Sequence, residues 1–220
     1  MKRGRYLLVL TRLISAVAAQ ESREEFNAGS LAAEWTTFKS PDSSRISLNG
    51  RPGFLRLQGS TVTLADTEVA PVFLARKQNL TDFEATTALE FTPSKSNETA
   101  GIALRQNERH FYEFGIRKTE TGRELYLQFV IGSIRTIAKT HPLPDGKAKL
   151  RVRGHPKYYR FSFSTGDGPF TEIGGVETKY LEGVDGLKSI FVGLFASGNG
   201  RESTTPADFD WFSFNENPRD

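Results

Sequence analysis

The sequence of 220 residues contains no cysteine. Disulfide bonds, thiolate metal sites and cysteine nucleophiles are therefore excluded. A chain of this length can bury a core large enough to fold without covalent cross-links, so the absence of cysteine does not argue against a secreted protein.

Neither sign of charge dominates the sequence. There are 29 basic and 26 acidic residues, which leave a formal net charge of +3. This balance is typical of a mixed, solvated surface and indicates neither nucleic acid nor a charged membrane as a partner. Beyond the first residues of the chain, no apolar run approaches the roughly 20 residues that a membrane-spanning helix needs.

Residues 1–19 have the pattern of a secretory signal peptide. Basic residues stand near the start, apolar runs cover residues 6–10 and 14–19, and Val17-Ala18-Ala19 resembles a cleavage site. Arg12 interrupts the apolar region, and the alternative is a disordered basic tail. We predict a signal peptide over residues 1–19, a single domain over residues 20–220, and an extracellular, monomeric protein.

Two triplets match the acceptor pattern for N-linked glycans. They are Asn79-Leu80-Thr81 and Asn97-Glu98-Thr99. The triplets predict glycosylation at Asn79 and Asn97, which fits a eukaryotic secretory route.

The apolar residues follow the period of β-strands. Between Asp82 and Phe91, apolar residues fall mainly at odd positions and polar residues at even positions, as in a strand with one buried face. The stretch Ala207–Phe214 is dense in aromatics, and strict alternation would put Phe209 and Trp211 on the face opposite Phe212 and Phe214. Because such a strand is covered on both faces, it predicts a sandwich that is closed by its last strand.

About a dozen strands follow one another at regular spacing, and no long helix is predicted. This pattern predicts an all-β sandwich of two antiparallel sheets. The expected strands are 46–48, 54–57, 61–64, 72–78, 82–91, 101–106, 110–117, 123–131, 134–139, 147–153, 158–164, 190–197 and 207–214, with an irregular stretch or one helical turn over 176–187.

Seven short motifs occur in one order along residues 35–214. They are Pro52-Gly53-Phe54-Leu55-Arg56-Leu57, Phe73-Leu74-Ala75-Arg76-Lys77-Gln78, Phe83-Glu84-Ala85-Thr86-Thr87, Ala100-Gly101-Ile102-Ala103-Leu104, the segment 159–168, Phe191-Val192-Gly193-Leu194-Phe195-Ala196 and Ala207-Asp208-Phe209-Asp210-Trp211-Phe212. In this order they resemble the concanavalin A-like C-terminal module of glycoside hydrolase family 43 β-xylosidases, which is also treated as a xylan-binding carbohydrate-binding module. The resemblance implies a concanavalin A-like β-sandwich (jelly roll) and non-catalytic binding of plant cell-wall polysaccharide, with xylan or xylo-oligosaccharides as ligand.

The sequence departs from this family in two respects. The propeller domain with the catalytic carboxylates, which usually precedes the module, has no counterpart in these residues. In the family, the loop before the motif at residues 73–78 can also lend an aromatic side chain to the active site of that propeller, whereas here the loop, residues 65–71, contains none. Both departures favour a free-standing module.

Polar and aromatic residues on the predicted strands supply a candidate saccharide site. Sugar binding needs flat aromatic faces for C–H stacking and polar groups for the hydroxyls. If the strands share one open sheet face, with Glu84 on it as well, the ligand-binding candidates are Arg76, Gln78, Thr86, Arg105, Tyr112, Glu113 and Tyr126. The structural alternative is that Arg76 forms a salt bridge with Glu84 or Glu113 and that Gln78 bonds to the backbone.

A small β-sandwich glycoside hydrolase or lyase is the rival hypothesis. A glycosidase needs two carboxylates around the scissile bond, about 5–5.5 Å apart for retention or 6.5–9.5 Å apart for inversion. Glu84 and Glu113 are the best catalytic pair by strand position, and the alternative is that both are ordinary strand glutamates. A third hypothesis is a module that interacts with another protein.

The remaining candidates concern ions and acidic sugars. Asp210, with Asp208 nearby, is a candidate ligand for a structural calcium ion, although calcium takes about six to eight oxygen ligands; the alternative is a carboxylate that accepts backbone hydrogen bonds. No other cofactor is expected. Lys149, Arg151 and Arg153 form a basic stripe along one strand face, which is either simply solvated or attracts acidic sugars such as glucuronic acid side groups.

Overall fold

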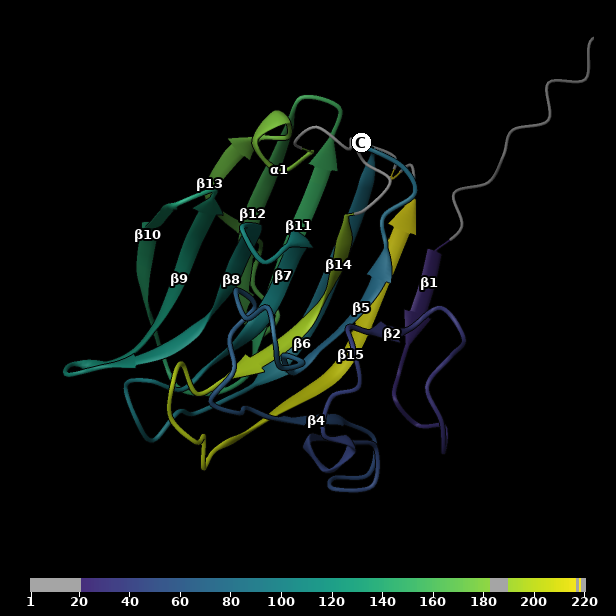
Figure 1. Ribbon diagram of the computed structural model, residues 1–220, viewed down its shortest axis with the longest axis vertical. Helices are drawn as coiled ribbons and strands as arrows, with labels where there is room; N and C mark the ends of the chain where they lie inside the picture. The colour runs from purple at the N-terminus through teal and green to yellow at the C-terminus, as the bar shows by residue number, and fades with distance from the viewer. Residues whose placement is uncertain (1–20, 183–189, 217, 219–220) are drawn as a thin grey trace, which may run out of the picture.

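The computed structural model describes residues 21–182, 190–216 and 218, so the predicted signal peptide lies outside the described residues. Two antiparallel sheets pack face to face, and the described helices are a 3-10 turn, η1 (Ser43–Arg45), and one short helix, α1 (Lys179–Glu182). The predicted all-β sandwich of two antiparallel sheets is confirmed (Figure 1). Neither described helix is long and apolar enough to span a bilayer.

Sheet 1 contains eight of the described strands. The strand β1 (Glu21–Glu24) pairs with β15, so the first and last described strands lie side by side (Figure 1). The other strands follow in the order β13 (Thr171–Glu177), β12 (Tyr158–Thr165), β11 (Ala148–His155), β6 (Phe83–Glu90), β15 (Pro206–Glu216), β4 (Leu55–Gln58) and β3 (Ile46–Ser47).

Sheet 2 contains seven of the described strands, and its edges are β10 and β2. Their order is β10 (Ile134–Leu143), β9 (Gly122–Ile131), β8 (His110–Thr119), β7 (Thr99–Asn107), β14 (Phe191–Ser197), β5 (Phe73–Lys77) and β2 (Thr36–Thr37). The chain changes sheet at β6, because β5 belongs to sheet 2, β6 to sheet 1 and β7 to sheet 2 again.

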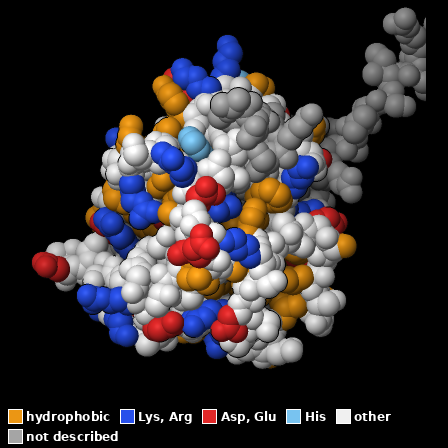
Figure 2. Space-filling view, viewed as in Figure 1, with side chains coloured by type: hydrophobic (Ala, Val, Ile, Leu, Met, Phe, Trp, Pro, Cys, Tyr) orange, Lys and Arg blue, Asp and Glu red, His pale blue; other side chains and the backbone are white. Residues whose placement is uncertain are grey.

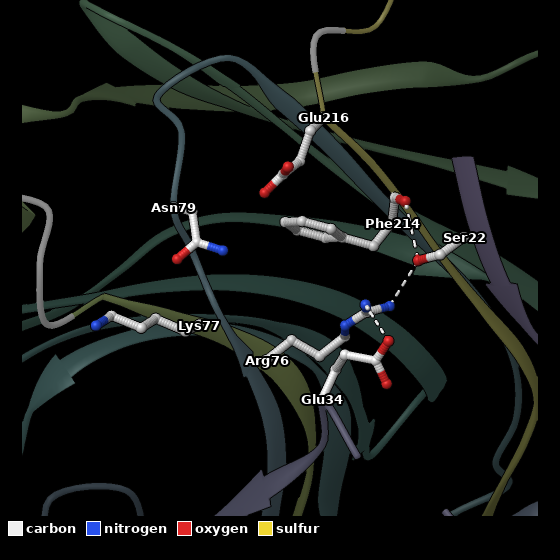
Figure 3. Close-up of a pocket in the computed structure, with 7 residues that line it drawn as sticks. All are labelled: Ser22, Glu34, Arg76, Lys77, Asn79, Phe214 and Glu216. Atoms are coloured by element: carbon white, nitrogen blue, oxygen red, sulfur yellow. Dashed lines mark hydrogen bonds and ion pairs between the residues drawn. The ribbon is translucent and has the colours of Figure 1, made fainter. Parts of the chain in front are cut away.

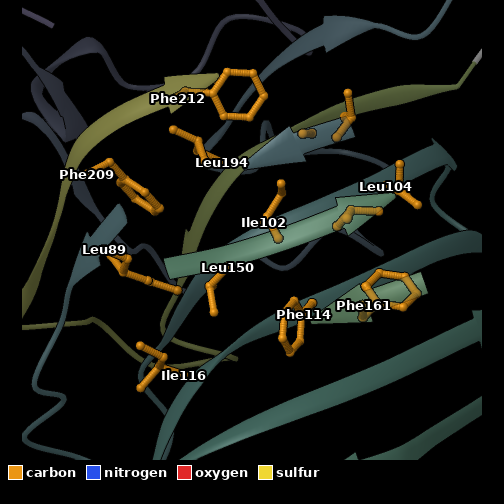
Figure 4. Packing of buried hydrophobic residues seen from close by; sticks show 14 of the residues in the cluster. Leu89, Ile102, Leu104, Phe114, Ile116, Leu150, Phe161, Leu194, Phe209 and Phe212 are labelled. Carbon is orange, nitrogen blue, oxygen red and sulfur yellow. The ribbon is translucent and has the colours of Figure 1, made fainter. Parts of the chain in front are cut away.

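Aliphatic and aromatic side chains fill the space between the two sheets (Figure 4). Leu89, Leu150 and Phe209 project from sheet 1, Ile102 and Phe114 project from sheet 2, and all five are 0% exposed. Burying each such side chain contributes roughly 1.5–3 kcal/mol, so this layer is what holds the sheets together. The outer surface is mixed in charge, because Figure 2 shows Lys and Arg side chains interspersed with Asp and Glu over the face in view.

A β-bulge changes the faces of the last strand. The pairing of β15 with β6 shifts between Phe209 and Trp211, so Asp210 is the extra residue. Phe209, Phe212 and Phe214 consequently all pack in the core, whereas Trp211 does not. The strict alternation predicted for residues 207–214 is wrong, because one extra residue reverses the faces of every residue after it.

The other differences from the predicted strands have local causes. Residues 61–64 do not form the predicted strand: Leu64 packs on the outer face of sheet 2, and its carbonyl accepts a hydrogen bond from Arg105 Nε at 3.1 Å instead of from a neighbouring strand. β1, β2 and β13 were not predicted. β1 and β2 are very short, and β13 contains Gly174 and Gly175, a residue type that is depleted in strands.

Candidate functional site

The predicted site residues do not share one sheet face. Glu84 and Thr86 lie on β6 of sheet 1, whereas Arg105 and Glu113 lie on β7 and β8 of sheet 2. Their immediate neighbours in each strand pack in the core, so these four side chains project from the outer faces of the two sheets. Packed sheets are about 10 Å apart, so the expectation of a single open face is wrong.

The candidate catalytic pair fails for the same reason. The Glu84 carboxylate lies 3.7 Å from Arg151 Nη1 on the outer side of sheet 1, and the Glu113 carboxylate lies on the opposite side of the sandwich. Two carboxylates with the core between them cannot flank one glycosidic bond. Glu84 and Glu113 are therefore not an acid–base pair.

Glu113 belongs instead to a buried hydrogen-bonded cluster on the outer face of sheet 2. Its Oε2 accepts hydrogen bonds from the Tyr126 hydroxyl at 3.0 Å and from Gln128 Nε2 at 3.1 Å. Burial raises the pKa of Glu113 to about 7, against the opposing effects of the Tyr126 hydrogen bond and the Arg135 charge. Burial also raises the pKa of Tyr126, with the Glu113 charge acting in the same direction.

The other predicted ligand residues are inaccessible to a polysaccharide. Tyr112 is 0% exposed and packs edge-on against Phe129 in the core, with ring centroids 4.9 Å apart. The Gln78 amide donates to the Leu80 carbonyl at 3.1 Å, which agrees with the structural alternative. Apart from Arg76, the predicted ligand residues are at most 7% exposed: Gln78, Thr86, Arg105, Tyr112, Glu113 and Tyr126. Neither Tyr112 nor Tyr126 therefore offers an open ring face on which a sugar could stack.

Arg76 is different, because it lines a cleft at the end of the sandwich (Figure 3). The cleft has a volume of about 340 Å³. Four separate segments of the chain supply its lining: Ser22 from β1, Glu34 from the segment before β2, Arg76, Lys77 and Asn79 from the end of β5, and Phe214 and Glu216 from the end of β15. We call this the Arg76 cleft.

Arg76 is held in a fixed position within the cleft. Its Nη1 donates to Ser22 Oγ at 2.7 Å, and its Nη2 lies 3.9 Å from Glu34 Oε1. The guanidinium carbon lies 5.4 Å from the centroid of the Phe214 ring. The predicted structural pairing of Arg76 with Glu84 or Glu113 is wrong, because Glu34 is the carboxylate beside it.

The chemistry of the Arg76 cleft suits a neutral, hydroxyl-rich ligand. Asn79 offers both an amide donor and a carbonyl acceptor, Glu216 offers acceptors only, and Arg76 offers donors only. In the view of Figure 3, Glu216 and Arg76 lie on opposite sides of the Phe214 ring, and Asn79 lies to the left of the ring, near Glu216. No sequence signal pointed to Ser22, Glu34 or Glu216, because they come from separate segments that meet only in the folded chain.

Asp208 and Asp210 have cationic side chains as partners. Asp210 accepts a hydrogen bond from Lys147 Nζ at 2.7 Å. Asp208 accepts from Arg56 Nε at 2.7 Å and from Arg51 Nη1 at 3.1 Å. Burial works to raise the pKa of Asp208, but the hydrogen bonds from the two arginines outweigh it and lower the pKa. The predicted calcium at Asp210 would have to displace Lys147, and the described residues contain no group of three or more His, Asp or Glu placed to hold a metal.

The two predicted glycosylation sites differ in accessibility. Asn79 is exposed at the mouth of the Arg76 cleft. The Asn97 amide nitrogen donates to the Gly198 carbonyl at 2.7 Å, and the next residue, Glu98, is 0% exposed. The geometry therefore leaves Asn79 as the accessible acceptor.

The comparison with known families agrees with this architecture. The family model described as the β-xylosidase C-terminal concanavalin A-like domain matches residues 23–215. The chain belongs to this family. The predicted resemblance to the C-terminal module of family 43 β-xylosidases and the concanavalin A-like fold are both confirmed.

Individual relatives are much longer than this chain. A non-reducing end α-L-arabinofuranosidase from Bacteroides ovatus is 30% identical over 199 residues, which cover 89% of this chain and 37% of that protein. Among solved structures, the GH43B protein of a Bacteroides ovatus xyloglucan locus has a TM-score of 0.82 at 30% identity, and the match covers 87% of this chain and 38% of that one. A xylan β-1,4-xylosidase from Bacillus halodurans C-125 has a TM-score of 0.80 at 25% identity, covering 88% of this chain and 39% of that one. The chain thus matches well under half of each relative, as their C-terminal domain.

Proposed function

We propose that this protein is a secreted, non-catalytic carbohydrate-binding domain for plant cell-wall polysaccharide, with xylan or xylo-oligosaccharides as its ligand. The family supports a saccharide ligand, because its members are domains of xylosidases and related glycosidases. The name of the Bacillus halodurans relative, a xylan β-1,4-xylosidase, makes xylan the first ligand to test.

The observation that carries this proposal is the Arg76 cleft. It combines a fixed guanidinium, an exposed amide and a carboxylate around one opening. Such a set of donors and acceptors can hydrogen-bond sugar hydroxyls without a formal charge on the ligand. A catalytic function has less support, because Glu84 and Glu113, the best candidate carboxylate pair, lie on opposite sides of the sandwich.

Retention on insoluble polysaccharide tests the proposal directly. The mature chain, produced in a host without N-glycosylation, is incubated with insoluble xylan, cellulose and chitin, and bound protein and released reducing sugar are measured. We expect retention on xylan above that on chitin, and no sugar release. Asn79→Ala should lower retention, whereas Asn49→Ala, at an exposed asparagine far from the cleft in sequence, should leave it unchanged.

Two outcomes would contradict the proposal. If the wild type releases sugar and Glu84→Gln or Glu113→Gln does not, the protein is a hydrolase. If the protein is not retained on any of the three polysaccharides and releases no sugar from them, its ligand would be another glycan or a protein partner.

A further inference from the structure

The hairpin that joins β11 to β12 ends at a second polar cavity. It has a volume of about 340 Å³ and is lined by Asp82, Arg153, Gly154, His155, Tyr158 and Arg160. None of these residues lines the Arg76 cleft. Arg153 lies on β11 and continues the row formed by Lys149 and Arg151, and Arg160 lies opposite it on β12.

Ring contacts fix the side chains around this cavity. The rings of His155 and Tyr158 are 4.3 Å apart and within 15° of parallel. The Arg160 guanidinium carbon lies 4.6 Å from the centroid of the Tyr158 ring. His155 Nδ1 accepts a hydrogen bond from the backbone N–H of Lys157 at 3.3 Å, so the neutral imidazole carries its proton on Nε2 and can donate from there.

Gly154 brings the cavity close to the core. A Cβ atom at this position would lie 2.3 Å from Cε1 of Phe83, a ring that is 0% exposed. Any larger residue would therefore have to displace a core side chain. Phe83 and the Thr81 carbonyl thus lie directly beneath Gly154.

Two arginines face each other across the hairpin. Arg153 and Arg160 are direct partners in the pairing of β11 with β12, which places their Cβ atoms about 4.5–5.5 Å apart, and like charges in such positions destabilise a sheet. Nearby carboxylates offset part of this repulsion. Glu172 lies 3.3 Å from Arg160 with both side chains 52% exposed, Glu84 is the partner of Arg153 in β6, and Asp82 lines the cavity.

We propose that this cavity binds a uronic acid residue of an acidic polysaccharide, with the sugar carboxylate between Arg153 and Arg160. The planar guanidinium forks match the geometry of a carboxylate. The Tyr158 hydroxyl and the Nε2–H of His155 supply partners for the sugar hydroxyls. This inference rests on the proposed function and narrows its ligand to xylan that carries uronic acid side groups.

Paired oligosaccharides test the inference by isothermal titration calorimetry. The two ligands are a neutral xylo-oligosaccharide and the same oligosaccharide with one glucuronic acid substituent, with free glucuronate, sulfate and phosphate as competitors. We expect the acidic ligand to bind the wild-type chain at least about tenfold more tightly, a size typical of a charge-assisted contact. Arg160→Gln should bind the two ligands about equally, with its affinity for the neutral ligand unchanged. Arg109→Gln is the control, at an exposed arginine of the β7–β8 turn, and it should keep the preference for the acidic ligand.

The outcomes separate this inference from the proposed function. Equal affinity for the two oligosaccharides overturns the inference but leaves xylan binding intact. If free glucuronate binds and the neutral ligand does not, the xylan proposal is overturned and the assignment of the cavity to a uronic acid is supported. Sulfate or phosphate that competes as well as glucuronate, or no binding of any anion, overturns the assignment to a uronic acid. Thermal unfolding of Arg160→Gln and Arg109→Gln verifies that both variants are folded, and we expect Arg160→Gln to unfold at no lower temperature than the control.

Discussion

Thr204 donates its backbone N–H to Glu98 Oε1 at 2.7 Å, across 106 residues of sequence. The same oxygen accepts from the N–H of Thr205 at 3.1 Å, and Oε2 accepts from the N–H groups of Ser94 at 2.7 Å and Lys95 at 3.1 Å. A single carboxylate thus ties the turn after β6 to the loop that leads into β15. It accepts hydrogen bonds from four backbone N–H groups, two from each of the two loops.

Replacement of this carboxylate should destabilise the fold. Burial works to raise the pKa of Glu98, but hydrogen bonds, first among them that from Thr204, outweigh burial and lower the pKa to about 2. Because the folded-state pKa is depressed, the stabilisation is present above about pH 4.5 and is lost as the pH falls towards 2. We expect Glu98→Gln to lower the free energy of unfolding at pH 7 by roughly 3 kcal/mol, measured by urea denaturation.

Glu120→Gln is the control for this measurement. Glu120 is exposed in the turn between β8 and β9, where a substitution should change stability by less than about 0.5 kcal/mol. Equal effects of the two substitutions at pH 7 would show that Glu98 does not hold the two loops together.

Glu113 should make stability depend on pH in the opposite sense. Its folded-state pKa is raised by burial to about 7, so the folded state holds the proton more tightly than the unfolded state does. Stability is then highest below about pH 4.5 and falls by roughly 3 kcal/mol as the pH rises to 7 and above.

Glu113→Gln removes this titration while leaving a polar group beside Tyr126 and Gln128. The variant should match the wild type at pH 4.5 and be more stable at pH 8, as measured by the midpoint of chemical denaturation. A variant that loses stability at pH 8 would mean that the charged carboxylate is well accommodated in the fold.

The sequence predicts the strands well but not which of them become neighbours. In β6 and β11 the alternation alone identifies the core residues, because neither strand contains a bulge. The shared binding face assumed that β5, β6, β7 and β8 lie in one sheet, whereas the chain crosses between sheets at β6. Pairing depends on how the two sheets pack, and a single sequence carries no local signal for it.

The same limit applies to the sites. The Arg76 cleft brings together residues that are far apart in sequence, such as Ser22 and Phe214, 192 positions apart, so periodicity within one strand cannot reveal it. The bulge at Asp210 is also set by tertiary structure, because it lets Phe209 and Phe212 both reach the core. The basic stripe was predictable, since it needs only the alternation of one strand, and its placement on the outer face is confirmed.

Two adjacent threonines of β6 should respond in opposite ways to the same substitution. The Thr86 hydroxyl is buried and has no hydrogen-bond partner, whereas Thr87 Oγ1 donates to the Trp211 carbonyl at 2.7 Å. Valine has the same shape as threonine but no hydroxyl. Thr86→Val should leave stability unchanged or raise it by up to about 1 kcal/mol, and Thr87→Val should lower it by about 1–2 kcal/mol.

Thr86→Val also decides whether Thr86 contacts a ligand. The position is 5% exposed, so we expect retention of Thr86→Val on xylan to equal that of the wild type. If retention is reduced while stability is unchanged, Thr86 contacts the ligand.

Glycosylation should compete with polysaccharide binding. Asn79 stands at the mouth of the Arg76 cleft, so a glycan on its amide would occupy the opening. Protein from a host that glycosylates should therefore carry a glycan at Asn79 and not at Asn97, as determined by mass spectrometry of tryptic peptides, and should be retained less on xylan than unglycosylated protein. Thr81→Ala abolishes the acceptor triplet without altering Asn79 and should restore retention in that host. If glycosylated and unglycosylated chains bind xylan equally while Asn79 is occupied, the polysaccharide does not enter the Arg76 cleft, and the binding surface must lie elsewhere on the sandwich.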